Sequence, residues 1–283
     1  MKIIECPRDA MQGIHEFIPT QKKIEYINSL LKVGFDTIDF GSFVSPKAIP
    51  QLRDTAEVLN NLDLSSTKSK LLAIVANTRG ADDAVGFDEI QYLGFPFSIS
   101  ETFQLRNTNA TIQEALIRVE EIQNLCIRNR KELVIYISMA FGNPYGDEWS
   151  SDVVIQWTTK LNQLGIKTIA LADTVGVSNP ESITYLFSKL IPRFTDVEFG
   201  AHLHSTPQTR NEKIKAAYHS GCRRFDVAVH GFGGCPMAND DLVGNLSTES
   251  LIDFLKEQNQ DLNLDENILK ESYLMANSVF PTV

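Results

Sequence analysis

Short apolar runs alternate with longer amphipathic stretches along almost all of this 283-residue chain, and this alternation constrains the fold most. The short runs are rich in Ile, Val and Phe and are bounded by Gly, Asn or Pro, a pattern that predicts β-strands. Runs such as Leu71–Ala76 are apolar throughout, as in parallel strands that are covered on both faces. We expect strands at Lys2–Cys6, Phe35–Gly41, Lys70–Asn77, Glu89–Gly94, Glu132–Phe141, Lys167–Thr174, Val197–His204 and Arg223–His230.

Between the expected strands, apolar residues recur at steps of three and four, which is the period of an amphipathic helix. Thr20 is expected to cap the first such helix and Gly34 to end it, and Asn179 precedes a proline at the start of another. Eight strands, each followed by a helix, close a barrel, so the predicted fold is α/β, a (β/α)8 TIM barrel with an extra C-terminal helix. The fourth unit fits least well, because Phe95–Ser100 is interpreted as irregular. Helices are expected at Thr20–Val33, Thr111–Arg130, Ser150–Leu164, Pro180–Leu190, Thr206–Ser220 and Asp265–Ser278.

Composition excludes several classes of function. The formal net charge of −10 argues against an extended nucleic-acid surface, which needs clustered Lys and Arg. The four cysteines form no CxxC pair, and no apolar stretch reaches the length that spans a bilayer. We therefore expect a soluble, cytoplasmic protein with no nucleic-acid or membrane partner. No linker, low-complexity tract or block of charge divides the chain, so residues 1–283 are expected to form one domain.

Charged residues stand at the ends of several expected strands, which is where barrels of this kind carry their chemistry. Arg8 and Asp9 follow the first strand, and a fixed cation there can stabilise a developing enolate oxygen; a surface ion pair is the simpler alternative. Asp39 lies inside the second apolar run, where a buried carboxylate needs a partner, and Arg8 is the expected one. Asp173 ends the sixth run and could equally cap the turn that follows it.

Candidate metal ligands stand at the ends of the last two strands. His202 and His204 are two residues apart, so on a strand both imidazoles face the same side, and imidazole is a common metal ligand. A glycine-rich segment, 231–238, then carries Cys235 on what is interpreted as a loop over the site, or as a turn with a bystander thiol. Asn245 could cap the next helix or turn its oxygen to a metal. Two His, one Asp and one Asn suit Mg²⁺ or Mn²⁺, and a Zn²⁺ site that uses Cys235 stays open.

Together these motifs resemble the 3-hydroxy-3-methylglutaryl-coenzyme A lyase family, in the family's order and over nearly the whole chain. The Arg-Asp and His-x-His elements also belong to a wider superfamily of metal-dependent barrel lyases and synthases. The Gly-Gly-Cys-Pro loop, together with Ser-Phe-Val-Ser-Pro, is much more specific to the lyase. The motifs are Pro7-Arg8-Asp9 with Gln12, Ser42–Lys47, Asp173–Gly176, His202-Leu203-His204 and Gly233–Pro236.

The resemblance implies a carbon–carbon lyase that cleaves 3-hydroxy-3-methylglutaryl-CoA to acetyl-CoA and acetoacetate with a divalent metal, Mg²⁺ or Mn²⁺. It implies an acyl-CoA substrate, and we expect a homo-oligomer, a dimer or a tetramer. Arg8 would stabilise the enolate, Cys235 would transfer a proton, and Gln12 and Ser42 would line the pocket. The residues that the resemblance places at the metal are Asp9, His202, His204 and Asn245, and those that it places in catalysis are Arg8, Asp9, Asp39, Asp173, His202 and Cys235.

Three positions depart from the pattern of that family. Asp39 stands where the family usually has Glu, Ser205 stands where it usually has Asp, and the Cys235–Asn245 segment is one residue longer. Two other functions stay open, because synthases share the Arg-Asp and His-x-His elements and because Asp39 and Ser205 depart from the lyase pattern. One is a Claisen-condensing synthase of the isopropylmalate or homocitrate type, although those enzymes are usually longer and lack the Gly-Gly-Cys-Pro loop. The other is a barrel that binds a ligand without catalysis.

Overall fold

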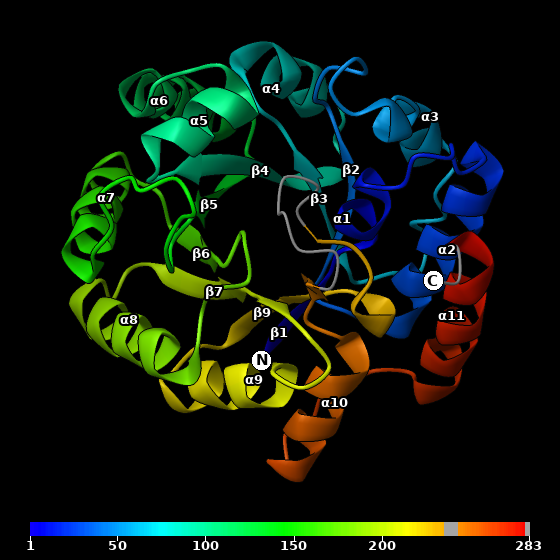
Figure 1. Ribbon diagram of the computed structural model, residues 1–283. Coiled ribbons are helices and arrows are strands. Elements are labelled where there is room, and N and C mark those ends of the chain that lie inside the picture. Colours follow the sequence, from blue (N-terminus) through cyan, green and yellow to red (C-terminus); the bar gives the residue numbers. More distant parts are fainter. Residues whose placement is uncertain (235–242, 281–283) are drawn as a thin grey trace.

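The computed structural model describes residues 1–234 and 243–280. Eight parallel strands hydrogen-bond into a closed barrel in the order β1-β2-β3-β4-β5-β6-β7-β9, and helices form a ring around them (Figure 1). This arrangement confirms the predicted (β/α)8 barrel. The barrel strands are β1 (Lys2–Glu5), β2 (Thr37–Ser42), β3 (Lys70–Ile74), β4 (Ile90–Ser98), β5 (Glu132–Ser138), β6 (Thr168–Ala172), β7 (Glu198–His202) and β9 (Arg224–Val227).

The helices begin and end largely where the spacing predicts. Asn179 caps its helix by accepting a hydrogen bond from the Ser182 backbone, and Gly34 ends another with a φ of 98°. Thr20 does not cap, because Pro19 holds the cap position and the Thr20 hydroxyl donates to Asp54 instead. The helices are α1 (Pro7–Gln12), α2 (Thr20–Val33), α3 (Thr55–Asn60), α4 (Thr78–Val85), α5 (Glu101–Thr108), α6 (Ile112–Arg128), α7 (Ser151–Gln163), α8 (Pro180–Arg193), α9 (Arg210–His219), α10 (Thr248–Glu257) and α11 (Glu266–Val279).

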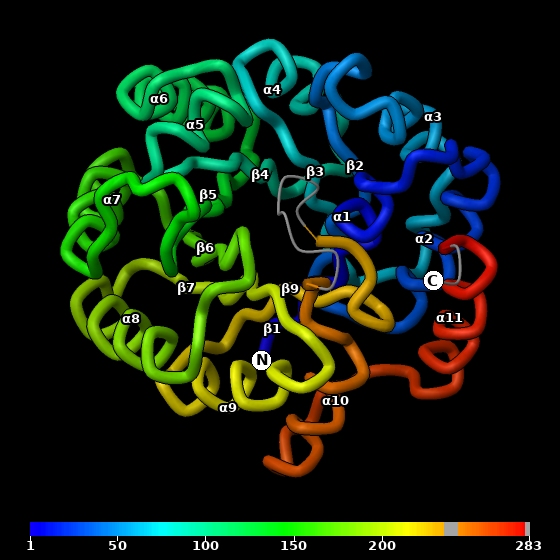
Figure 2. The backbone as a smooth tube through the Cα atoms, in the orientation of Figure 1, coloured from blue at the N-terminus to red at the C-terminus, as the bar shows by residue number. Residues whose placement is uncertain are grey.

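The barrel is closed by β9, which pairs with β1 on one side and with β7 on the other. The backbone trace in Figure 2 follows this ring and shows α11 lying beside α2, so the last helix packs against an early one. Ser272 donates to Ser29 at 3.0 Å across these two helices, and the rings of Tyr26 and Phe280 meet edge to face at 5.6 Å. The predicted C-terminal helix is therefore part of the outer layer.

Apolar side chains fill both the outside and the inside of the barrel. A large cluster lies between strands and helices, and a smaller one fills the interior. Gly94 makes room in the interior, because a Cβ there would lie 2.5 Å from Ile74 Cδ1 and 3.0 Å from Tyr136 Cε2. The interior therefore holds packed apolar side chains as well as the buried Arg224, and the chemistry is left to the strand ends. The interior cluster consists of Leu72, Tyr92, Val134, Tyr136 and Ala170.

Several expected strand boundaries are wrong. The third, fifth and last strands end at Ile74, Ser138 and Val227, three residues before their expected ends. The fourth strand does not stop at Gly94, because β4 continues to Ser98 and pairs with β5 along that length. Pro96 is tolerated because β3 pairs with β4 only as far as Gly94, so the missing N–H removes no hydrogen bond on that side. The seventh strand ends at His202, and His204–Ser205 instead forms β8, which pairs antiparallel with β10 (Gly244–Asn245).

No helix among the described residues is long and apolar enough to cross a membrane. The three cysteines in that part of the chain, Cys6, Cys126 and Cys222, are buried and unpaired.

Candidate metal centre

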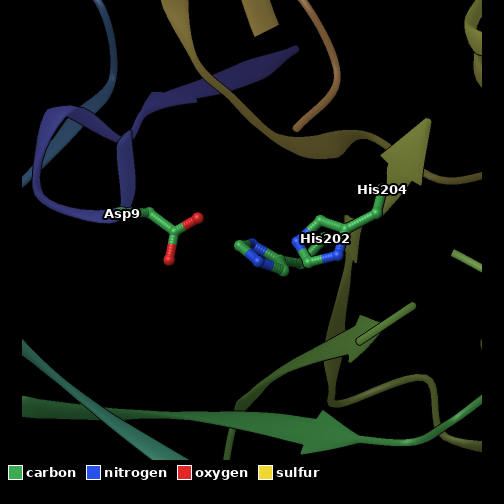
Figure 3. Close-up of side chains that lie close together, drawn as sticks. All are labelled: Asp9, His202 and His204. Carbon is green, nitrogen blue, oxygen red and sulfur yellow. The ribbon is translucent and has the colours of Figure 1, made fainter. Parts of the chain in front are cut away.

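Asp9, His202 and His204 converge at the carboxyl end of the barrel. One ligand atom of each lies within 4.8 Å of the others, a spacing that could hold a metal ion. Asp9 comes from α1, while His202 ends β7 and His204 begins β8. The close-up shows the carboxylate of Asp9 pointing toward the two imidazoles from across the barrel mouth (Figure 3). The expectation that both histidines face one side is confirmed.

Neighbouring oxygens orient both imidazoles. His202 Nδ1 lies 3.2 Å from Asp226 Oδ2, and His204 Nδ1 lies 3.2 Å from the carbonyl oxygen of Thr174. An Nδ1–H that donates to oxygen leaves the lone pair on Nε2, which is the atom that a histidine offers to a metal. The buried His204 Nε2 has no hydrogen-bond partner among the described residues. Both histidines are therefore held in an orientation that suits ligation.

Burial and charge act differently on the two imidazoles. Burial and the nearby His202 lower the pKa of His204 to about 4, so this ring is neutral near pH 7. Burial alone lowers the pKa of His202, but the hydrogen bond and charge of Asp226 and the charge of Asp9 outweigh it, and the net shift is upward. For Asp9, burial raises the pKa, and Arg8 and the two histidines lower it by more. Asp9 is thus ionised and ready to hold a cation.

Arg8 is buried at the centre of a carboxylate network. Its Nη2 donates to Asp39 Oδ2 at 2.5 Å, and Nε donates to both oxygens of the same carboxylate. Nη1 donates to Asp9 Oδ1 at 2.9 Å and to Gln12 Oε1 at 2.7 Å. The expected Arg8–Asp39 pair is confirmed, and the alternative of a surface ion pair is wrong because Arg8 is only 6% exposed. Burial still raises the pKa of Asp39 to about 6 against the charge of Arg8.

Asn245 joins the cluster and does not cap a helix. Its Nδ2 donates to Asp9 Oδ2 at 2.7 Å and to the carbonyl of Phe232 at 2.9 Å. Pairing of β10 with β8 places Asn245 opposite His204. The cap of α10 is Ser247, so the capping alternative for Asn245 is wrong.

The sequence of this chain matches a known family and known proteins. The HMGL-like family model matches residues 2–273 of the chain. The chain belongs to the HMGL-like family. It is 31% identical to a hydroxymethylglutaryl-CoA lyase of Bacillus subtilis over 272 residues, which is 95% of this chain and 88% of that protein. It is 32% identical to the cytoplasmic 3-hydroxy-3-methylglutaryl-CoA lyase of Rattus norvegicus, over 96% of this chain and 79% of that protein.

Solved structures agree with this membership. An HMG-CoA lyase of Acinetobacter baumannii, solved in complex with coenzyme A and 3-methylmalate, superposes with a TM-score of 0.90 at 31% identity. That match covers 99% of this chain and 90% of the other. The HMGL-like barrel is therefore preserved along nearly the whole of both chains.

Other residues expected at the site of this HMGL-like chain lie beside the cluster or outside the described part. The Asp173 carboxylate accepts hydrogen bonds from Ser178 and, at 2.9 Å, from Lys213 Nζ. The Ser42 hydroxyl donates to the carbonyl of Ile74. Cys235 lies outside the described residues. The loop that leads to it passes close to Asp9, because a Cβ on Gly233 would lie 2.9 Å from the Asp9 carbonyl oxygen.

Two residues of this site were missed from the sequence. Asp226 interrupts the apolar run Phe225–Val227, the same signal that pointed to Asp39, and could have been found in that way. Lys213 gives no such signal, since one lysine on a helix face is ordinarily solvated. It is only 3% exposed, and it donates to the His204 carbonyl at 2.7 Å as well as to Asp173. The Ser205 hydroxyl does not orient either imidazole. It donates to the Asn245 carbonyl instead.

Proposed function

We propose that this chain is a hydroxymethylglutaryl-CoA lyase, which cleaves 3-hydroxy-3-methylglutaryl-CoA to acetyl-CoA and acetoacetate. One observation carries the proposal: in a chain of the HMGL-like family, Asp9, His202 and His204 converge beside the buried cation Arg8 at the barrel mouth. A synthase and a non-catalytic barrel are less favoured, because the relatives reported above, at 31–32% identity, bear the name of the lyase.

The residues present fit a divalent cation. The orphaned, buried Nε2 of His204 needs a partner that the described residues do not provide, and a buried polar atom left without one costs about 1–3 kcal/mol. An ionised carboxylate, two imidazoles and the amide oxygen of Asn245 make a mixed N/O set that suits Mg²⁺ or Mn²⁺. When bound, such an ion supplies positive charge that lowers the pKa of a substrate hydroxyl.

In this proposal Asp9, Arg8 and Cys235 each act in one step of the cleavage. Asp9 accepts the proton of the substrate's tertiary hydroxyl, and the adjacent carbon–carbon bond then breaks to give acetoacetate and the enolate of acetyl-CoA. Arg8 stabilises the enolate charge, since Asp39 and Gln12 hold its guanidinium in place. Cys235 returns a proton to the enolate carbon from the loop whose base packs on Asp9.

Asp173 and Ser42 have narrower roles in the proposal. Asp173 is bound by Lys213 and Ser178, so we assign it the task of holding the turn that presents the Thr174 carbonyl to His204. Ser42 ends β2 at the rim of the barrel and, with Gln12, is assigned to the lining of the acyl-CoA pocket. Binding of coenzyme A by the related lyase of Acinetobacter baumannii supports an acyl-CoA substrate.

We also propose the number of domains, the location and the assembly of the protein. The packing of α11 on α2 supports a single domain over residues 1–283. The unpaired thiols of Cys6, Cys126 and Cys222 support a reducing, cytoplasmic location. A homo-oligomer, dimer or tetramer, is retained as the expected assembly, and light scattering on the purified protein tests it.

The decisive experiment is a coupled assay for acetoacetate released from 3-hydroxy-3-methylglutaryl-CoA. Metal-stripped protein is expected to be inactive and to recover turnover when Mg²⁺ or Mn²⁺ is added. A parallel assay offers acetyl-CoA with a 2-oxo acid. Condensation there without cleavage would establish the synthase instead, and metal binding without either reaction would establish a non-catalytic barrel.

A further inference from the structure

Arg224 is a fully buried cation inside the barrel, at the end opposite the metal centre. It begins β9 and has no exposed surface. Gly200 of the neighbouring strand β7 makes room for it, because a Cβ there would lie 3.1 Å from Arg224 Cδ. Its Nε, Nη1 and Nη2 atoms have no hydrogen-bond partner among the described residues. The nearest carboxylate oxygen that forms an ion pair with it is Glu198 Oε2, 3.7 Å from Nη1.

Two more orphaned polar atoms lie in the same interior. Asp226 follows Arg224 by two residues on β9, so the side chains of both project to the same face of the strand. Its Oδ1 is buried without a partner in the described part of the chain, and so is the hydroxyl of Tyr136 on β5. Electrostatics links these residues as well: burial lowers the pKa of Arg224, and Asp226, Tyr136, Glu198 and Tyr92 together raise it by more.

Both orphaned neighbours of Arg224 contact His202. Asp226 uses its other oxygen, Oδ2, to accept from His202 Nδ1 at 3.2 Å. The ring of Tyr136 meets the imidazole edge to face, with 5.5 Å between centroids. The residues with unpartnered atoms thus make up a polar region that includes Arg224 at the start of β9 and two direct neighbours of His202.

Protein atoms satisfy this region only in part. Glu198 pairs with Arg224 Nη1 at 3.7 Å and the centroid of the Tyr92 ring lies 5.8 Å from Arg224 Cζ, but neither contact is a hydrogen bond. Each buried polar atom without a hydrogen bond costs about 1–3 kcal/mol, and more when it is charged. The region has five of them: three nitrogens of Arg224, one oxygen of Asp226 and one of Tyr136. Internal water normally fills this need, since one molecule makes about three hydrogen bonds to buried polar groups. A guanidinium, a carboxylate and a phenol offer the donors and acceptors that a water requires.

We propose that Arg224, Asp226 and Tyr136 enclose an internal hydration site beneath His202, and that the ordered water held there fixes the carboxylate that orients this imidazole. Arg224 is thereby a positioning residue that acts on His202 through Asp226. The second half of the inference rests on the proposed function, because it takes His202 as a metal ligand. The hydration site itself does not depend on the metal.

The first test counts long-lived internal water without reference to metal. Magnetic relaxation dispersion of ¹⁷O water is measured on the folded wild-type protein and on Arg224→Met, with Arg223→Met as the matched control. Arg223 is the adjacent arginine and faces solvent. Loss of at least one long-lived water from Arg224→Met alone is expected. Equal dispersion in the three proteins, or a high-resolution crystal structure in which Arg224 bonds Asp226 directly with no water between, would overturn the hydration site.

The second test measures Mn²⁺ affinity by calorimetry, together with urea unfolding to confirm that each variant is folded. Removing a residue that orients a metal ligand typically weakens affinity about 10–100-fold, so Asp226→Asn is expected in that range and Arg224→Met at about tenfold. Arg223→Met should bind like the wild type. If Arg224→Met does not fold, Arg224→Lys takes its place and is expected to weaken binding by a smaller factor.

The two proposals fail in different ways. If the wild type binds no Mn²⁺ and cleaves no substrate, the proposed function is wrong, while the water measurement still decides the hydration site. If the wild type binds Mn²⁺ and Arg224→Met or Arg224→Lys binds it equally well, the positioning role of Arg224 is wrong, while the lyase proposal stands.

Discussion

Glu5 is a buried carboxyl whose ionisation should make the stability of the barrel depend on pH. It ends β1, has no exposed surface and faces the outer helices. Its Oε1 accepts from the Val229 backbone at 2.9 Å and its Oε2 accepts from the Thr248 hydroxyl at 2.6 Å. Burial nevertheless raises the pKa of Glu5 to about 8 from an ordinary value of 4.5. The folded protein therefore holds a proton on Glu5 near neutral pH that the unfolded chain releases.

The sign of the effect follows from this raised pKa. The stabilisation linked to Glu5 is fully present below about pH 4.5 and is lost as the pH rises through about 8. The difference between these two pKa values sets an upper limit of about 5 kcal/mol on the effect. Because the hydrogen bonds to Glu5 allow partial relaxation, we expect about 2–4 kcal/mol between pH 5 and pH 9.

The substitution Glu5→Gln removes this ionisation and keeps the shape of the side chain. The amide oxygen can still accept from Val229, and the amide nitrogen can donate to the Thr248 hydroxyl. Urea unfolding by circular dichroism is measured at intervals from pH 5 to pH 9 for wild type and variant, with the exposed Glu120→Gln as control. The wild type should lose about 2–4 kcal/mol relative to Glu5→Gln over this range. Parallel stability curves would refute the argument.

Three further predictions concern the site. Lys213→Met leaves the buried Asp173 carboxylate unpaired and should lower the free energy of unfolding by about 3–5 kcal/mol in urea titrations; a change under 1 kcal/mol would contradict the network. In Arg8→Lys a single ammonium cannot reproduce the forked contact of the guanidinium with Asp39. The kcat for acetoacetate release should therefore fall about 10²–10³-fold, and an unchanged kcat would contradict the assigned role. Mn²⁺ affinity should weaken as the pH falls through the raised pKa of His202, because the proton competes with the metal. Asp226 raises the pKa of His202, so Asp226→Asn should move this transition to lower pH. Calorimetry at several pH values measures it, and an affinity that does not change with pH would contradict the prediction.

Local spacing was enough to predict the barrel and the place of its chemistry. Strand and helix periods are properties of neighbouring residues, so eight strands and six of the helices could be recognised without any long-range contact. The short helices α3, α4 and α5 were not predicted. The same two-residue period predicted that His202 and His204 face one side. The need of a buried carboxylate for a cation predicted the pairing of Asp39 with Arg8, because burial itself was visible in the apolar run around Asp39.

Contacts between distant segments were decided only by the folded arrangement of the strands. Asn245 and Asp9 are 236 residues apart, and neither position reveals that one amide bonds the other's carboxylate instead of capping a helix. Pro96 stays within β4 because the pairing with β3 has already ended at Gly94, a fact of register between neighbours. Lys213 reaches Asp173 only because α9 lies against the strand ends. In each case the outcome depends on a contact between segments that are distant in sequence. No local pattern shows which residues the closure of eight strands brings together.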